Sequence, residues 1–416
     1  MPSAKAADLG GDCCADLEER VAELEATTAR KGNRRVSLTI SGQVTTHLMY
    51  WNDGNTTQGS DIYVADNVAG AGTFVQFAGQ ARINPNVTVG FQLAFSFTAG
   101  ARSLGVTQLD DDGGGPADTT INSHLSNWWI DHKALGRLTV GRTNTATAGI
   151  TTIDLGGAGV IANASIGFWQ RAMRFTNNAG VLSGSADDNW GSLMGGGTVN
   201  GAATARANAV LYSSPIFGGL SVQAAFGEDD IWDAALRYAG EFGGIRVAAG
   251  IGYAFNHTGT DEFGKDHLVD REISQWKGSA SILHVASGLY LTGAYVDQDN
   301  DAANTRNTTL WYVQGGISKN WTGLGSTVLY GEYAQVKGGV NSATAKLPGF
   351  ALGYTNVNNS EVNVWGIGVV QHIDAAAMEL YLAYRRYSAE VTNFPNPAFN
   401  DPNDMDVIVA GARIRF

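Results

Sequence analysis

Histidine and cysteine are the side chains of this 416-residue chain that would ligate a metal or activate a nucleophile. The two cysteines, Cys13 and Cys14, are adjacent, a spacing that does not suit a zinc site. No phosphate-binding loop, nucleophile elbow or serine-triad order is present. The histidines are scattered without metal-ligand spacing: His47, His124, His132, His257, His267, His284 and His372. The sequence therefore indicates neither a metal centre nor a cofactor site, and it argues against an enzyme.

Charged side chains are the second source of chemistry, and acids and bases occupy different parts of the chain. The acids gather in connecting segments such as Asp110–Asp112 and Glu228–Asp230, whereas the bases more often stand inside alternating stretches. The formal net charge of −12 argues against nucleic acid as a partner. Two interpretations stay open: the acidic loops are simply solvated, or a basic wall faces an acidic loop.

The stretch Val407–Phe416 shows the kind of element that positions these charges. Read as a strand, it places Ile408 and Ile414 on one face and Arg413 and Arg415 on the other. A soluble sandwich would bury the apolar face, whereas a membrane barrel would turn it to lipid and the arginines to a water-filled lumen. The same alternation recurs along almost the whole chain, most cleanly over 87–97.

Composition and turn pattern favour the barrel. Glycine is abundant (54) and proline scarce (8), which suits many strands joined by turns. Tight turns such as Asn84–Asn86 alternate with longer polar connections, and the alternating stretches number about sixteen. Their second face is rich in Ser, Thr, Gln, Gly and Arg, which would not form a packed soluble core. We therefore predict an all-β fold in which residues 34–416 form a transmembrane antiparallel β-barrel of about 16 strands.

Alternation places a set of basic side chains on the lumen face, where they would line the pore: Arg82, Arg237, Lys277 and Arg385. The alternative is that these arginines neutralise structural carboxylates such as Glu332 and Glu379. Arg206 and Val210 are an even number of residues apart, so they share the same parity and lie on the same face of a strand. Val210 should face lipid, so Arg206 reaches the lumen only if a β-bulge shifts the register.

The longest connection runs from about 144 to about 204 and shows no clear strand period. It is too long for an idle surface loop, and Ile161, Phe168 and Trp169 indicate that part of it is packed. We expect this segment to fold into the lumen and narrow it.

The first 33 residues form a separate segment with a short helix over about 13–30. Leu17, Val21 and Leu24 follow a three-four spacing among charged residues, which predicts a coiled-coil seam. A seam without an internal partner favours association of identical chains, and packing of the helix on its own barrel is the alternative. Cys13 or Cys14 would link neighbouring chains by a disulfide in an oxidising compartment.

Several motifs resemble one family of proteins. The motifs are Leu138–Arg142 and Leu211–Leu220 on either side of the long connection, and Asp12–Arg20 with Ser37–Gly42 near the start. In order and spacing, and with the terminal phenylalanine, they resemble the alphaproteobacterial porins, trimeric general porins of the bacterial outer membrane.

The resemblance implies a homotrimer of sixteen-stranded barrels that pass small hydrophilic solutes. It also implies an eyelet in which acids of the third loop face a basic wall, and it puts Arg142 at the arginine position that opens this loop. The best available loop acids are Asp154, Asp187 and Asp188, although the acidic signature of the best-known porins is absent.

Three functions are compatible with these features. The leading one is an outer-membrane general diffusion porin, a water-filled channel for ions and small hydrophilic solutes. The second is a substrate-specific channel. The third is a structural protein that tethers the membrane to the cell wall through its N-terminal helix. Expected partners are two further copies of the chain, outer-membrane lipid and lipopolysaccharide, and peptidoglycan through the N-terminal segment.

Overall fold

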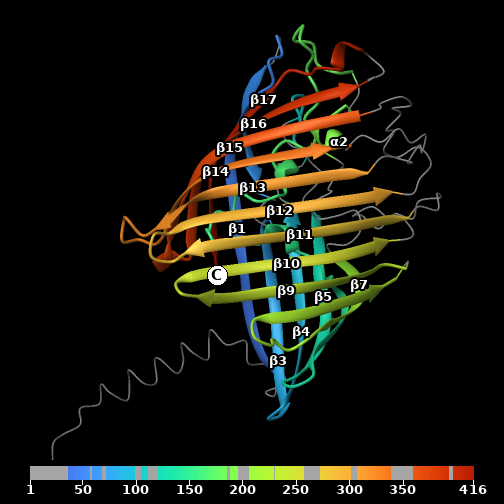
Figure 1. Cartoon of the computed structure of the whole chain (residues 1–416), viewed down its shortest axis with the longest axis vertical. Helices are drawn as coiled ribbons and strands as arrows, with labels where there is room; N and C mark the ends of the chain where they lie inside the picture. The colour runs from blue at the N-terminus through green and yellow to red at the C-terminus, as the bar shows by residue number, and fades with distance from the viewer. Residues whose placement is uncertain are drawn as a thin grey trace, which may run out of the picture.

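The strands of the chain form a single antiparallel sheet that curves into a barrel (Figure 1). The computed structural model describes residues 36–56, 59–67, 72–98, 105–110, 120–184, 188–194, 206–228, 230–256, 272–300, 307–338, 359–392 and 397–416. The strands are β1 (Ser37–Asn52), β2 (Ser60–Asp66), β3 (Phe74–Asn84), β4 (Val87–Thr98), β5 (Thr120–His132), β6 (Gly136–Asn144), β7 (Arg206–Ser213), β8 (Leu220–Gly227), β9 (Trp232–Phe242), β10 (Ile245–Asn256), β11 (Ile273–His284), β12 (Leu289–Asn300), β13 (Thr308–Lys319), β14 (Thr327–Lys337), β15 (Asn359–Ile373), β16 (Met378–Thr392) and β17 (Met405–Arg415). The N-terminal segment 1–33, with its predicted helix, lies outside the described residues.

The barrel closes where its first and last strands meet. β1 pairs with β17 from Gln43 opposite Arg415 to Asn52 opposite Asp406. On its other edge β1 pairs with β2 over its second half and with β3 over its first half. β2 and β3 thus share one position in the ring, so the 17 strands fill sixteen positions. The prediction of about sixteen strands with the first and last paired is confirmed, and no sheet edge is left at the seam.

The two faces of the sheet differ as the alternation predicts. In β1, Val44 and Leu48 are exposed on the outer side, whereas Thr45 and His47 between them are buried on the inner side. In β4, Leu93 is 38% exposed and Ala94 beside it is fully buried. Exposed aromatic rings follow the outer surface, in keeping with an interfacial belt: Trp232, Trp276, Tyr295, Trp311 and Trp365. Apolar side chains are therefore available to lipid around the barrel.

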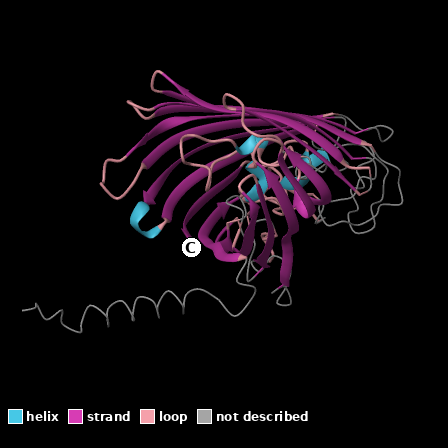
Figure 2. Ribbon diagram, turned by 90° about the horizontal axis from the view of Figure 1, so that it is seen from below, coloured by secondary structure: helices cyan, strands magenta, loops and turns pink. Residues whose placement is uncertain are grey.

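One long connection lies inside the ring of strands (Figure 2). We call its described residues, 145–184 and 188–194 between β6 and β7, the inner loop. It contains the short helices η2 (Ile150–Thr152), η3 (Ile166–Phe168) and α2 (Trp190–Leu193), while η4 (Asp374–Ala376) and η5 (Pro397–Phe399) lie in other connections. Within the described residues, none of the helices is both long and apolar enough to cross a membrane.

The inner loop has a hydrophobic core in common with the barrel wall. Ile161, Trp169 and Phe175 of the loop are buried together with Tyr330 and Tyr387, which project from the lumen side of β14 and β16. A segment of this length needs buried apolar area to offset its ordering entropy, and the wall supplies it. Folding of the long connection into the lumen, as expected from the sequence, is what the structure shows.

Candidate functional site

The inner loop is fastened to the lumen wall at its start. Asp233 of β9 accepts hydrogen bonds from the backbone amides of Ala146 and Thr147, at 3.0 and 2.7 Å, and from the Thr147 hydroxyl at 2.8 Å. Arg237, four residues along β9, donates to the carbonyls of Ala146 and Ala148 at 3.0 and 2.6 Å. At the start of the inner loop, the carboxylate thus accepts from the backbone amides and the guanidinium donates to the backbone carbonyls.

The predicted pore residues Arg237 and Lys277 are on the lumen side, but the loop covers them. Lys277 is 2% exposed, and its cross-strand neighbour Gly252 lies so close to Thr147 that an added Cβ would stand 2.7 Å from the Thr147 methyl group. Ser279, on the same strand as Lys277, donates a hydrogen bond to the carbonyl of Ile150. Arg237 therefore supports the loop from behind, and Lys277 is buried beside it.

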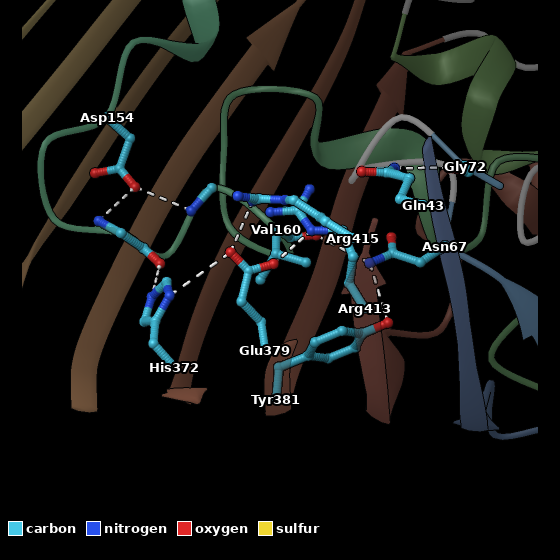
Figure 3. Close-up of polar contacts among 12 residues, drawn as sticks. Gln43, Asn67, Gly72, Asp154, Val160, His372, Glu379, Tyr381, Arg413 and Arg415 are labelled. Atoms are coloured by element: carbon cyan, nitrogen blue, oxygen red, sulfur yellow. Dashed lines mark hydrogen bonds and ion pairs between the residues drawn. The ribbon is translucent and has the colours of Figure 1, made fainter. Parts of the chain in front are cut away.

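Asp154, the first of the predicted loop acids, is bonded within its own loop (Figure 3). Its carboxylate accepts hydrogen bonds from the backbone amides of Gly156, Gly157 and Gly159, at 2.7, 3.0 and 2.9 Å. Burial raises the pKa of Asp154 above its ordinary value, although these amides act in the opposite direction. The carboxylate therefore shapes the arc 154–160 of the loop.

A polar chain in the lumen holds this arc to the wall (Figure 3). The Nε2 atom of His372 lies 2.9 Å from the carbonyl oxygen of Gly157, so this nitrogen carries the proton and donates. The Nδ1 atom of His372 faces Glu379 at 3.7 Å. Glu379 in turn accepts hydrogen bonds from Arg413 and, at 2.8 Å, from Arg415. Glu379 is thus a carboxylate neutralised by lumen arginines, the alternative drawn from the sequence, although its partners come from β17.

A second contact holds the end of the arc. Asn67, just after β2, donates to the carbonyl of Val160 at 2.9 Å and to the Tyr381 hydroxyl at 3.1 Å (Figure 3). Asn67 is fully buried, so both bonds are shielded from water. The arc is therefore pinned from β2, β15 and β16 at once.

Arg385 is the most deeply covered of the predicted pore residues. Its side chain is 1% exposed and that of Glu332 is 2% exposed, and the two form a bidentate ion pair at 2.6 and 3.0 Å. The guanidinium lies 4.1 Å from the centre of the Trp169 ring and donates to the carbonyl of Ile166 at 3.3 Å. Arg385 therefore does not face the solute path. It joins the inner loop to β14, the other structural role that the sequence left open.

Glycine makes this ion pair possible. Gly366 of β15 lies directly between Glu332 of β14 and Arg385 of β16. A Cβ at this position would stand 2.8 Å from a Glu332 carboxylate oxygen and 3.0 Å from the Arg385 Cγ atom. The missing side chain lets the two charged groups meet across an intervening strand.

Two further predicted pore residues lie away from the inner loop contacts. Arg82 is exposed at the end of β3 and donates to the carbonyls of Asn84 and Pro85 in the tight turn, at 3.2 and 3.3 Å. Arg142 pairs with Asn208, in a register that puts it on the same face as exposed Val210. Arg142 is therefore on the outer face of the barrel, which differs from the prediction.

Arg206 also lies on the outer face of the barrel. The pairing of β6 with β7 has no register shift, so Arg206 keeps the parity of Val210. The register shift in this region falls in β5, opposite Ala94 and Phe95. At the end of β7, the Arg206 guanidinium lies 3.1 Å from the ring of His124. The bulge that would bring Arg206 into the lumen is therefore absent from its pairing with β6, and the observed shift lies two strands away in β5.

The remaining predicted loop acids are Asp187 and Asp188. Asp188 accepts a hydrogen bond from the Ser183 hydroxyl within the loop, and Asp187 lies outside the described residues. The sequence reading missed the roles of Asp233 and Asn67, because each depends on a loop contact more than 80 residues away in the chain. The alternation of side chains along a strand does not indicate that either residue holds the loop.

A closed antiparallel barrel with an apolar exterior, a polar interior and an inward loop defines a water-filled diffusion channel of the outer membrane. The chain belongs to the Gram-negative porin family, whose model matches residues 4–392. This family and the fold point to a channel rather than an enzyme.

Solved structures with the same fold are distant in sequence. An anion-selective porin from Comamonas acidovorans is 15% identical, with a TM-score of 0.57 over 92% of this chain and 100% of that chain. OmpF of Salmonella typhi, in complex with daunomycin, is 15% identical, with a TM-score of 0.53 over 92% and 98%. OmpT of Vibrio cholerae in a trimer form is 13% identical, with a TM-score of 0.51 over 92% and 99%. No curated protein matches the sequence.

Proposed function

We propose that the protein is a general diffusion porin that works as a homotrimer and passes ions and small hydrophilic solutes without a substrate-specific track. The observation that carries this proposal is the one-sided packing of the inner loop. The loop is bonded to β9, β11, β15 and β16, which we group with the rest of β9–β17 as the covered wall. On the opposite side, which we call the bare wall (β3–β6), the ion pair of Arg137 and Asp131 keeps side-chain exposures of 42% and 38%.

Solutes would therefore pass between the inner loop and the bare wall. Arg137 stacks over Trp129 at 4.1 Å and is the basic residue that a solute meets there. Arg82, at the same level three strands away, is bonded to turn carbonyls. Arg237 and Arg385 act indirectly, because they hold the loop that forms the other side of the passage, and Lys277 is buried away from solutes.

Single-channel recording in planar bilayers tests this function. A general porin gives a conductance that rises in proportion to salt concentration and passes sugars of graded size up to a cut-off. Saturation of the current by one solute would identify a substrate-specific channel. If correctly folded protein gave no conductance, the result would favour the structural protein that tethers the membrane to the cell wall.

The outer surface supports assembly of identical chains. Arg142, Ser126 and Asn208 are cross-strand neighbours on the outward face of β5–β7. An arginine exposed to lipid costs about 2–4 kcal/mol at the middle of a bilayer, so a protein surface covers this patch better than lipid does. Electrophoresis of unboiled and boiled protein tests the trimer, and a monomer in both lanes contradicts it. The proposed seam of Leu17, Val21 and Leu24, and the linking cysteines Cys13 and Cys14, belong to the segment outside the described residues.

We also propose lipid and cell-wall partners. Above the aromatic pair Trp365 and Tyr384, Arg386 bonds Asp404 and Asp406 on the outer face, a polar band suited to the headgroups of outer-membrane lipid and lipopolysaccharide. Native mass spectrometry tests retention of these lipids. Binding of peptidoglycan is expected to disappear when residues 1–33 are removed, and retained binding would contradict that role.

A further inference from the structure

A second external segment enters the lumen beside the inner loop. The described residues Gly105–Asp110, between β4 and β5, form a tight turn in which the amide of Thr107 donates to the carbonyl of Asp110 at 2.9 Å. Val106 is fully buried, and the Tyr63 hydroxyl of β2 donates to the carbonyl of Thr107 at 2.9 Å. Leu109, at the tip of the same turn, is 61% exposed. One side of the turn is therefore packed and the other is open.

Gln108 attaches this turn to the inner loop. Its side-chain oxygen accepts from the backbone amide of Arg174 at 2.9 Å, and its side-chain nitrogen donates to the carbonyl of Arg174 at 2.8 Å. The same nitrogen donates to Asp53 at 2.8 Å. Gln108 is 5% exposed, so a side chain from an external loop pairs with the backbone of the inner loop much as a strand neighbour would.

Asp53 joins three segments that are far apart in the sequence. This carboxylate, 1% exposed at the end of β1, accepts from Gln108, from the Thr176 hydroxyl at 2.9 Å and from the backbone amide of Asn55 at 2.9 Å. These donors are neutral groups, and a buried carboxylate depends on them for its stability. Losing one donor therefore affects the turn, the inner loop and the wall together.

Apolar side chains make this junction dry. Met49, Trp51 and Tyr63 on the lumen side of β1 and β2 are buried in one cluster with Val106 and with Phe175 of the inner loop. The rings of Trp51 and Tyr63 lie 5.9 Å apart. A water-filled barrel has no other reason to bury such side chains in its lumen, because water would solvate that face if the junction were open.

We propose that Gly105–Asp110 is a wedge that seals the gap between the inner loop and the wall of β1 and β2, with Gln108 as its positioning residue. This inference rests on the proposed diffusion function. The wedge forces solutes to the bare-wall side of the inner loop and thereby sets the effective cross-section of the pore. Without it, water and solutes gain a second path behind the loop.

The decisive variants exchange the donor and acceptor at this contact. Gln108→Glu sets a carboxylate against Asp53, so we expect the wedge to leave, single-channel conductance to rise and larger sugars to enter in liposome-swelling assays. Asp53→Asn combined with Gln108→Glu restores a donor-acceptor pair between these two side chains in the opposite sense, while the Arg174 carbonyl stays without its side-chain donor. We expect the double variant to return conductance and size cut-off part of the way to the parent values.

Leu109→Ala is the matched control, because Leu109 belongs to the same turn and is exposed. It should conduct as the parent does. A Gln108→Glu channel with parental conductance and cut-off overturns the proposal, and so does a rise that the second substitution leaves uncorrected. Loss of strand content in Gln108→Glu is detected by circular dichroism, and Gln108→Leu then replaces it with the same expected rise. A parent protein that conducts no ions would instead refute the diffusion function itself.

Discussion

Two ion pairs on the lumen face of the barrel show how differently the two walls use charge. Arg385 and Glu332 on the covered wall have side-chain exposures of 1% and 2%, whereas Arg137 and Asp131 on the bare wall have 42% and 38%. Both pairs obey the alternation that sends polar side chains inward. The difference comes from the inner loop, which lies on one pair and leaves the other in water. Parity therefore assigns a charge to the lumen without deciding whether a solute meets it.

Breaking the buried pair should have the largest effect. Arg385→Ala leaves Glu332 charged, buried and unpaired, and we expect the free energy of unfolding to fall by about 3–5 kcal/mol. Arg137→Ala, the control on the bare wall, should cost about 0–1 kcal/mol because water already solvates its partner. Urea titration of both variants in lipid vesicles measures the difference. Equal losses would remove the distinction between the walls.

Loosening the start of the inner loop should have an intermediate effect. Asp233→Asn keeps one acceptor oxygen but removes the negative charge to which the amides of Ala146 and Thr147 donate. We expect the free energy of unfolding to fall by about 1–3 kcal/mol. Hydrogen exchange at these two amides should accelerate. Glu361→Gln, which removes a partly exposed pair with Lys337, is the control. Unchanged protection of the amides in Asp233→Asn would contradict the anchoring role.

The arc of the inner loop should respond to pH through Asp154. Burial raises the pKa of this carboxyl in the folded protein, so the folded state holds the proton more tightly than the unfolded state. The stability contributed by this group is present below its ordinary pKa of 3.8 and is lost as pH rises through the raised value. Asp154→Asn should abolish this slope when the free energies of unfolding of parent and variant are compared across pH. Parallel curves would contradict the assignment.

The smallest effect is expected at the short-turn rim. Arg82 bonds turn carbonyls and lies apart from the contacts of the inner loop, so Arg82→Ala should leave the reversal potential in a salt gradient close to the parent value. Arg137→Ala, which leaves the half-exposed carboxylate of Asp131 without its partner, should shift the reversal potential toward cation preference. If Arg82→Ala shifts it further than Arg137→Ala does, the turn carbonyls do not hold the Arg82 guanidinium away from the solute path.

Much of the fold was predictable because alternation is a local property. The strand pattern, the closure of β1 on β17 and the outward face of Leu93 all follow from a period of two residues. The inward path of the long connection followed from its length and apolar content. The shared position of β2 and β3 did not, because the short β2 lies within one of the longer polar segments that were read as connections.

Site residues were predicted less well because their surroundings come from distant segments. Arg385 was assigned to the correct face, but its burial requires Trp169, more than 200 residues earlier in the chain. Arg142 was assigned to the lumen by resemblance to a family motif, while its own parity with Val140 pointed outward. Where parity and resemblance disagreed, parity was the better guide to the direction of the side chain.

The seam between β1 and β17 has a consequence for how the barrel is made. Its partners, such as Val44 and Ile414, are separated by nearly the whole barrel sequence, so the contact that completes the ring is also the most non-local one. Before it forms, two strand edges carry unpaired amides and carbonyls, which hydrocarbon does not tolerate. Entry of these two strands into the bilayer is therefore coupled to completion of the ring.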